Sequence, residues 1–119
     1  MAKFSFIEKS KFEKLFGMSS GYVLDFSDRT FQEFIADAIK VDIYDEKYNH
    51  GSGSKANRLR GYWLAESNYN IGKLLEKLLE YWMHKVQMQE IDYDRTDELL
   101  YEECLKIVEN LKSENPVEN

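Results

Sequence analysis

Apolar side chains recur every three or four residues along much of the chain, which is the spacing of amphipathic α-helices. The clearest stretch covers about 70–84 or slightly beyond. Glu76 and Glu80 occupy its opposite side. Its apolar face consists of Ile71, Leu74, Leu75, Leu78 and Trp82. Four further helices are predicted on the same grounds, at about 10–16, 28–40, 55–66 and 96–112.

The first of these helices has two candidate start signals. Ser10 with Glu13 forms one capping box, and Ser5 with Glu8 forms a second that would move the start earlier. Gly17 follows the helix at the position where a C-terminal glycine is common. We expect a helix that ends near Phe16, with its start set by one of the two boxes.

The other helices also carry start signals. Ser27 can cap the helix at 28–40, with Phe26 packing back onto Phe31, and Ser54 can cap the helix at 55–66. Thr96 is the expected cap of the last helix.

The segments between the helices differ in character. Residues 21–26 read as a buried extended segment, and 44–54 as an irregular loop rich in Gly and Ser. Residues 87–95 form a polar connection, and 113–119 a frayed tail. The expected fold is all-α: a compact orthogonal bundle of about five helices with one irregular Gly/Ser loop.

Composition adds limits to this reading. A chain of 119 residues with 43% hydrophobic and 14% aromatic residues can form one packed domain. The net charge of −6 is uneven, because residues 62–119 hold 13 acidic and 6 basic residues whereas residues 1–61 are nearly neutral. An anion-binding surface is therefore expected only in the first half.

The chain shows no signal peptide and no apolar stretch long enough to cross a bilayer. We therefore expect a cytoplasmic protein without a membrane partner. The single cysteine, Cys104, excludes an intrachain disulfide and lies on an apolar helix face, which indicates a core position.

The most suggestive local feature is a Gly/Ser turn at 51–54 that leads into a basic helix start. Backbone amides of such a turn can converge on an anion, and Lys55, Arg58 and Arg60 would add positive charge. The pattern is not that of a P-loop. The alternative is a flexible loop followed by a capped helix with a solvated basic face.

Aromatic side chains surround this turn. Tyr44 and Tyr48 could stack on a nucleic-acid base, whereas Tyr62 and Trp63 have the spacing of core residues.

Catalytic chemistry is weakly indicated. The triplet at 45–47 could belong to a metal-dependent nuclease, but surface ion pairs explain it more simply. His50 and His84 lack neighbours at metal-ligand spacing. We expect no catalytic residue, metal or cofactor.

Four blocks of the sequence, at 21–31, 44–48, 53–63 and 72–82, resemble in their order the N-terminal domain of AbiJ-like abortive-infection proteins, a bacterial phage-defence group. The resemblance covers about residues 10–85. It implies a sensor or regulatory domain at 1–90, followed by an acidic connector helix at 91–119 that packs on it.

The resemblance also implies a partner. Such domains precede a helical HEPN-type ribonuclease effector with an Arg-x4-6-His signature, which neither His50 nor His84 completes here. We therefore expect a non-enzymatic sensor domain that belongs with a separate or downstream effector.

The expected function is recognition of a phage-derived or nucleic-acid signal. The alternative is a protein-interaction module that docks onto the effector or forms a homo-oligomer. In that case Asp45 and Glu46 would form ion pairs with Arg58 or Arg60. The candidate ligand-binding residues are Tyr44, Lys47, Tyr48, Ser54, Lys55, Arg58 and Arg60.

Overall fold

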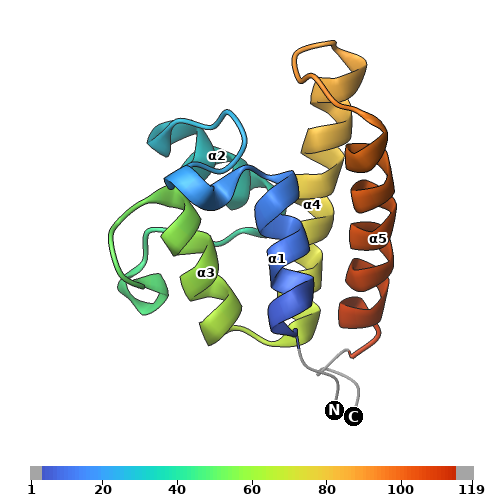
Figure 1. Ribbon diagram of the computed structural model, residues 1–119. Helices are drawn as coiled ribbons and strands as arrows, with labels where there is room; N and C mark the ends of the chain where they lie inside the picture. Colours follow the sequence, from blue (N-terminus) through green and yellow to red (C-terminus); the bar gives the residue numbers. More distant parts are fainter. Residues whose placement is uncertain (1–3, 115–119) are drawn as a thin grey trace.

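The computed structural model describes residues 4–114, in which all regular structure is helical (Figure 1). The prediction of an all-α bundle is confirmed. Two short 3-10 helices, η1 (Met18–Ser20) and η2 (Glu46–Tyr48), accompany the α-helices. The α-helices are α1 (Phe6–Leu15), α2 (Asp28–Ile39), α3 (Lys55–Ala65), α4 (Asn68–Gln87) and α5 (Arg95–Lys112).

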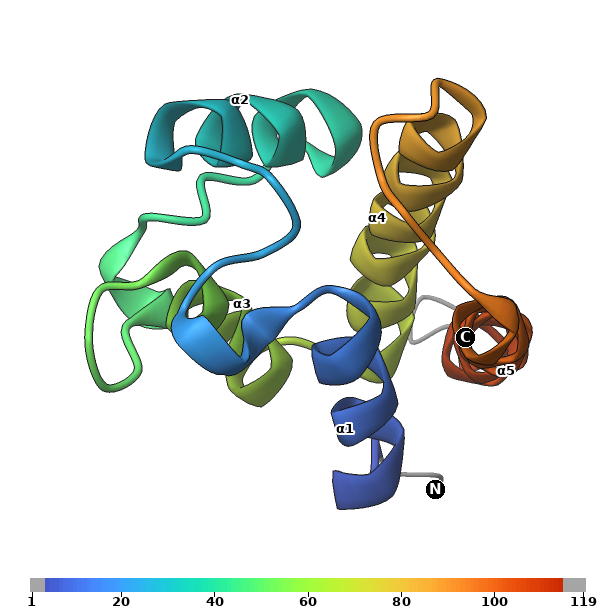
Figure 2. The ribbon, with the colours of Figure 1, turned by 45° about the horizontal axis from the view of Figure 1, so that its top comes forward.

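The helices pack around one hydrophobic core. Helices α4 and α5 lie side by side and antiparallel, and α1 packs against α5 (Figure 1). Helix α2 crosses α4 at a steep angle (Figure 2). Cys104, Tyr62 and Trp63 are buried, as predicted. The core is continuous from Phe4 to Leu111, so α5 shares it with the rest of the chain. No described helix is long and apolar enough to span a membrane.

Capping side chains fix the helix starts. Ser27 and Ser54 cap α2 and α3, as predicted, by accepting hydrogen bonds from the amides of Thr30 and Asn57. The starts of α4 and α5 differ from the predicted positions. Helix α4 begins at Asn68, because Ser67 accepts from the amide of Asn70.

Helix α5 begins at Arg95, because Asp94 rather than Thr96 caps it. A carboxylate accepts a backbone hydrogen bond more strongly than a hydroxyl and suits the positive helix end.

Helix α1 uses the earlier of its two candidate capping boxes. The Ser5 hydroxyl accepts from the Glu8 amide at 3.1 Å, and the Glu8 carboxylate accepts from the Ser5 amide at 3.0 Å. Ser10 lies inside the helix and donates its hydroxyl to the carbonyl of Ile7. The helix therefore begins four residues before Ser10, and Gly17 follows it with φ of 65°.

The segment at 21–26 is less regular than predicted. Val23 and Phe26 are buried, but Tyr22 is 57% exposed and Leu24 sits in a turn with φ of 51°. The segment is held at its start, because the carbonyl of Gly21 accepts from the amide of Ala56 at 3.0 Å. It is therefore a turn that docks onto the start of α3.

The Gly/Ser region at 44–54 is partly ordered by η2, which was not predicted. Of the expected tail at 113–119, Ser113 caps the end of α5, and 115–119 lie outside the described residues.

Candidate functional site

Lys55 does not lie on an open basic surface. Its side chain is in the interior at the start of α3, with only 8% of the residue exposed. Its ammonium group lies 3.3 Å from the Asp28 carboxylate and 4.8 Å from the centre of the Tyr22 ring. The charge expected to bind an anion is therefore paired with Asp28, whose side chain is itself 78% exposed, at the junction of α2 and α3.

Tyr44 and Arg58 lie next to the Lys55–Asp28 pair. The Tyr44 hydroxyl donates to the Asp28 carboxylate at 3.2 Å, and the Arg58 guanidinium lies 5.1 Å from the centre of the Tyr44 ring. Burial, helped by the negative charge of Asp28 and the hydrogen bond to it, raises the pKa of Tyr44 to about 12. Tyr44 therefore stays neutral and acts as a donor at physiological pH.

We call these five residues, Tyr22, Asp28, Tyr44, Lys55 and Arg58, the Asp28 cluster. They come from three of the four sequence blocks and join the starts of α2 and α3 to the chain before η2. The Asp28 carboxylate accepts from both Tyr44 and Lys55. Such a cluster fixes the relative position of the segments, but it contains no base aimed at a nucleophile.

Arg60 is also engaged internally. Its guanidinium lies 3.1 Å from the Glu13 carboxylate on α1 and donates to the Asn57 side chain at 2.8 Å. These contacts tie α3 to α1 and leave the arginine half-buried.

Tyr48 is the most enclosed of the predicted binding residues. It is 1% exposed, and its hydroxyl donates to the Glu66 carboxylate at 2.7 Å. Burial, together with that hydrogen bond, raises its pKa. Its ring is packed against Tyr62, with centroids 5.1 Å apart. Stacking on a ligand would therefore require η2 to detach.

The ion pairs expected for Asp45 and Glu46 are not formed in the described part of the chain. The Asp45 carboxylate instead accepts from the amide of Lys47, while its backbone carbonyl accepts from Arg58 at 3.0 Å. Asp28 pairs with Lys55, and Glu13 pairs with Arg60. Asp45 is kept local because its side chain is short and caps η2.

Asp28 and Glu13 were missed because both are distant in sequence from their partners. Asp28 lies in the first turn of α2, where helix electrostatics alone explain an acidic residue. One signal in the sequence could have indicated this contact: Asp28, Tyr44 and Lys55 each lie in a different block of the family resemblance.

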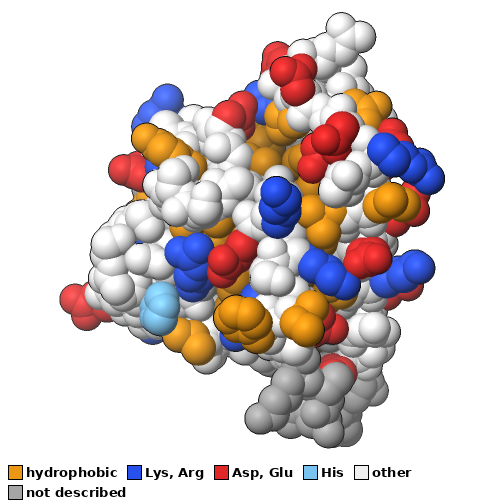
Figure 3. All heavy atoms as spheres, viewed as in Figure 1, with side chains coloured by type: hydrophobic (Ala, Val, Ile, Leu, Met, Phe, Trp, Pro, Cys, Tyr) orange, Lys and Arg blue, Asp and Glu red, His pale blue; other side chains and the backbone are white. Residues whose placement is uncertain are grey.

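Lys47 is exposed and Arg58 is partly buried, and neither forms an ion pair among the described residues. Lys47 lies 5.3 Å from the centre of the Tyr48 ring. On the face drawn in Figure 3, basic and acidic side chains are interspersed rather than gathered into one basic patch.

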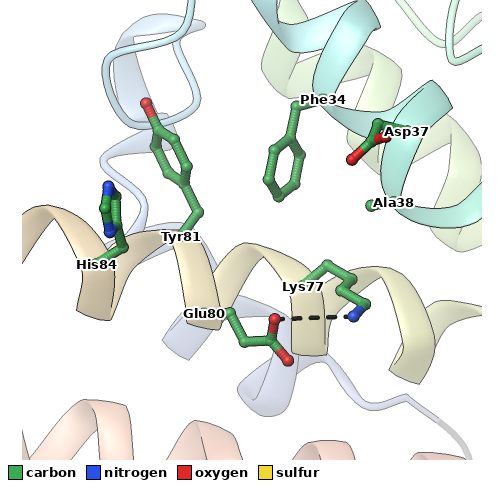
Figure 4. Close-up of a pocket in the computed structure, with 7 residues that line it drawn as sticks. All are labelled: Phe34, Asp37, Ala38, Lys77, Glu80, Tyr81 and His84. Carbon is green, nitrogen blue, oxygen red and sulfur yellow. Dashed lines mark ion pairs between the residues drawn. The ribbon is translucent and has the colours of Figure 1, made fainter.

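A separate hollow of about 400 Å³ lies between α2 and α4 (Figure 4). Phe34 and Tyr81 project into it, with ring centroids 5.3 Å apart. Lys77 and Glu80 pair across its edge at 3.7 Å. His84 also lines it, but its imidazole has no hydrogen-bond partner among the described residues, so it lacks the partner that orients a general base.

The described residues offer neither a cluster of metal ligands nor a reactive thiol. These contain no group of three or more His, Cys, Asp or Glu side chains placed to hold a metal ion. Burial raises the pKa of the Cys104 thiol to about 12, so it is not a nucleophile at neutral pH.

Comparison with known proteins returns no matching family model, curated protein or solved structure.

Proposed function

We propose that this chain is a non-enzymatic regulatory domain of the abortive-infection type, which acts on a separate HEPN-type ribonuclease effector through protein contact. The observation that carries the proposal is the use of the motif cations. Lys55 pairs with Asp28 and Arg60 pairs with Glu13, so these two cations build a framework that joins α3 to α2 and to α1. Such a framework fixes the relative positions of the helices, and so the shape of the surface that a protein partner would contact. Its paired cations contribute little free positive charge to nucleic-acid binding.

Recognition of a nucleic-acid signal is the second candidate. Lys47 and Arg58 favour it, because both are cationic without an ion-pair partner among the described residues and both lie against tyrosine rings. Two cations give a weak and salt-sensitive electrostatic contribution to nucleic-acid binding.

Binding of short RNA and DNA across a salt series separates the two candidates. We expect no saturable binding at physiological ionic strength. Saturable binding that is lost in both Lys47→Glu and Arg58→Gln, with the helical circular dichroism unchanged, would favour the nucleic-acid function. Glu46→Lys, which adds a cation on the same short helix, is the matched control for a purely electrostatic effect.

Co-expression tests the protein contact itself. The partner to use is a helical protein with the Arg-x4-6-His signature encoded next to this chain. We expect the two to copurify at a fixed ratio through size exclusion. Separate elution of the two folded proteins would contradict the proposal.

A further inference from the structure

The antiparallel pair α4 and α5 carries an apolar groove that none of the family-like features explains. Its volume is about 420 Å³. Met83 and Val86 of α4 line one wall, and Tyr101 and Leu105 of α5 line the other. Trp82 forms the base, where it is stacked on Tyr101 with ring centroids 5.1 Å apart. Trp82 is buried, so the base of the groove belongs to the hydrophobic core.

Apolar groups of this groove remain in contact with water. Tyr93, in the connection before α5, is 46% exposed, and Leu105 is 38% exposed. Tyr93 also meets Trp82 edge to face at 6.1 Å, so the connection closes one end of the groove. Burying such side chains against a partner would release free energy in proportion to the apolar area covered.

The charged rim selects among partners. Glu98 and Glu102 are the charged side chains among the described residues that line the groove. Glu98 has only an exposed contact with Arg95 at 3.2 Å, and Glu102 forms no ion pair in the described part of the chain. A second copy placed symmetrically on the groove would bring like charges together, which opposes self-association.

We infer that the groove between α4 and α5 binds an amphipathic helix of a protein partner, whose apolar stripe is flanked by Lys or Arg. The apolar stripe would cover Leu105, Val86 and Met83, as in other helix-in-groove complexes. The flanking cations would meet Glu98 and Glu102, and one of them could lie over the exposed Tyr93 ring. The inference rests on the proposed function only in taking the partner to be a protein.

The test uses two synthetic helical peptides of about 16 residues, long enough for some helix formation in water. Both carry the same Leu stripe; one is flanked by Lys and the other by Glu. Fluorescence anisotropy with the intact chain measures binding of each. We expect the Lys-flanked peptide to bind at least about tenfold more tightly than the Glu-flanked peptide, with a preference that shrinks at high salt.

Variants of the chain assign the binding to the groove. Glu98→Lys combined with Glu102→Lys should reverse the preference between the peptides, and Leu105→Gln should weaken both by about tenfold. Glu46→Lys and Leu64→Gln are the matched controls, because Glu46 and the exposed Leu64 lie outside the groove. Neither control should change binding.

Equal binding of the two peptides, no binding of either, or binding unaffected by the groove variants would each overturn the inference. If the effector copurifies and the groove variants leave that contact intact, the proposed function stands and the groove assignment fails. If the groove binds the Lys-flanked peptide but no effector copurifies, the groove assignment stands and the proposed function fails.

Discussion

The α carbon of Gly61 in α3 lies directly against the backbone carbonyl of Tyr48 in η2. A β carbon at Gly61 would overlap the carbonyl oxygen and carbon of Tyr48. Both atoms belong to the backbone, so no side-chain rotation can relieve the overlap. This contact sets how closely η2 packs on α3, and with it the burial of the Tyr48 ring.

Gly61→Ala is therefore expected to destabilise the protein by about 1–3 kcal/mol through overpacking. The sign of the change in the free energy of unfolding is diagnostic, because Gly→Ala inside a helix otherwise stabilises a protein by up to about 1 kcal/mol. Urea unfolding followed by circular dichroism measures the change. Gly53→Ala is the control: a β carbon there meets nothing within 4 Å, so its stability should stay near wild type. A Gly61→Ala protein as stable as wild type would show that η2 does not pack as described.

The Asp28–Lys55 pair makes a second prediction. A double-mutant cycle with Asp28→Asn and Lys55→Met should give a favourable coupling of about 1 kcal/mol, since Lys55 is buried although Asp28 is largely exposed. The cycle cancels the separate effect of Asp28 on the helix dipole.

The exposed pair Arg29 and Glu33 within α2 is the reference for that cycle, and its coupling should be no more than about 0.5 kcal/mol. Equal coupling in the two pairs would mean that Lys55 is solvated.

Alkaline pH should destabilise the protein through its tyrosines. Burial, with hydrogen bonds to Asp28 and Asp25, raises the pKa of Tyr44 and of Tyr81 to about 12, from an ordinary value of 10.0. A raised pKa in the folded state means that the stability is complete below pH 10 and is lost as the pH rises towards 12.

Urea midpoints at successive pH values measure this loss, and tyrosinate absorbance follows the ionisation itself. Tyr44→Phe combined with Tyr81→Phe should flatten the fall. A wild-type midpoint that stays constant up to pH 12 would contradict the assignment of these hydrogen bonds.

Local patterns were sufficient to predict the helices. Periodicity located α4 because Leu74, Leu75 and Leu78 face one core, and Ser27 and Ser54 marked helix starts by a short-range hydrogen bond. Errors arose where two residues competed for one role, as Asp94 and Thr96 did at the start of α5. The Asp94 carboxylate is the stronger acceptor and suits the positive helix end, so it caps the helix.

The candidate site could not be predicted in the same way. Lys55 and Arg60 have the composition of a basic surface, but their carboxylate partners lie 27 and 47 residues away. The helix packing decides whether a cation faces water or a carboxylate, and no local pattern encodes it. Gly61 likewise has no local reason to be glycine until η2 is placed against it.

The most direct test of the proposed regulatory role is the RNA cleavage rate of the proposed helical effector, measured with and without an equimolar amount of this chain. We predict that the chain alone cleaves no RNA and that its addition changes the effector's rate. We also predict that the change persists in Lys47→Glu, since no nucleic-acid contact is needed. An effector rate that is the same with and without the folded chain would contradict the proposed regulatory role.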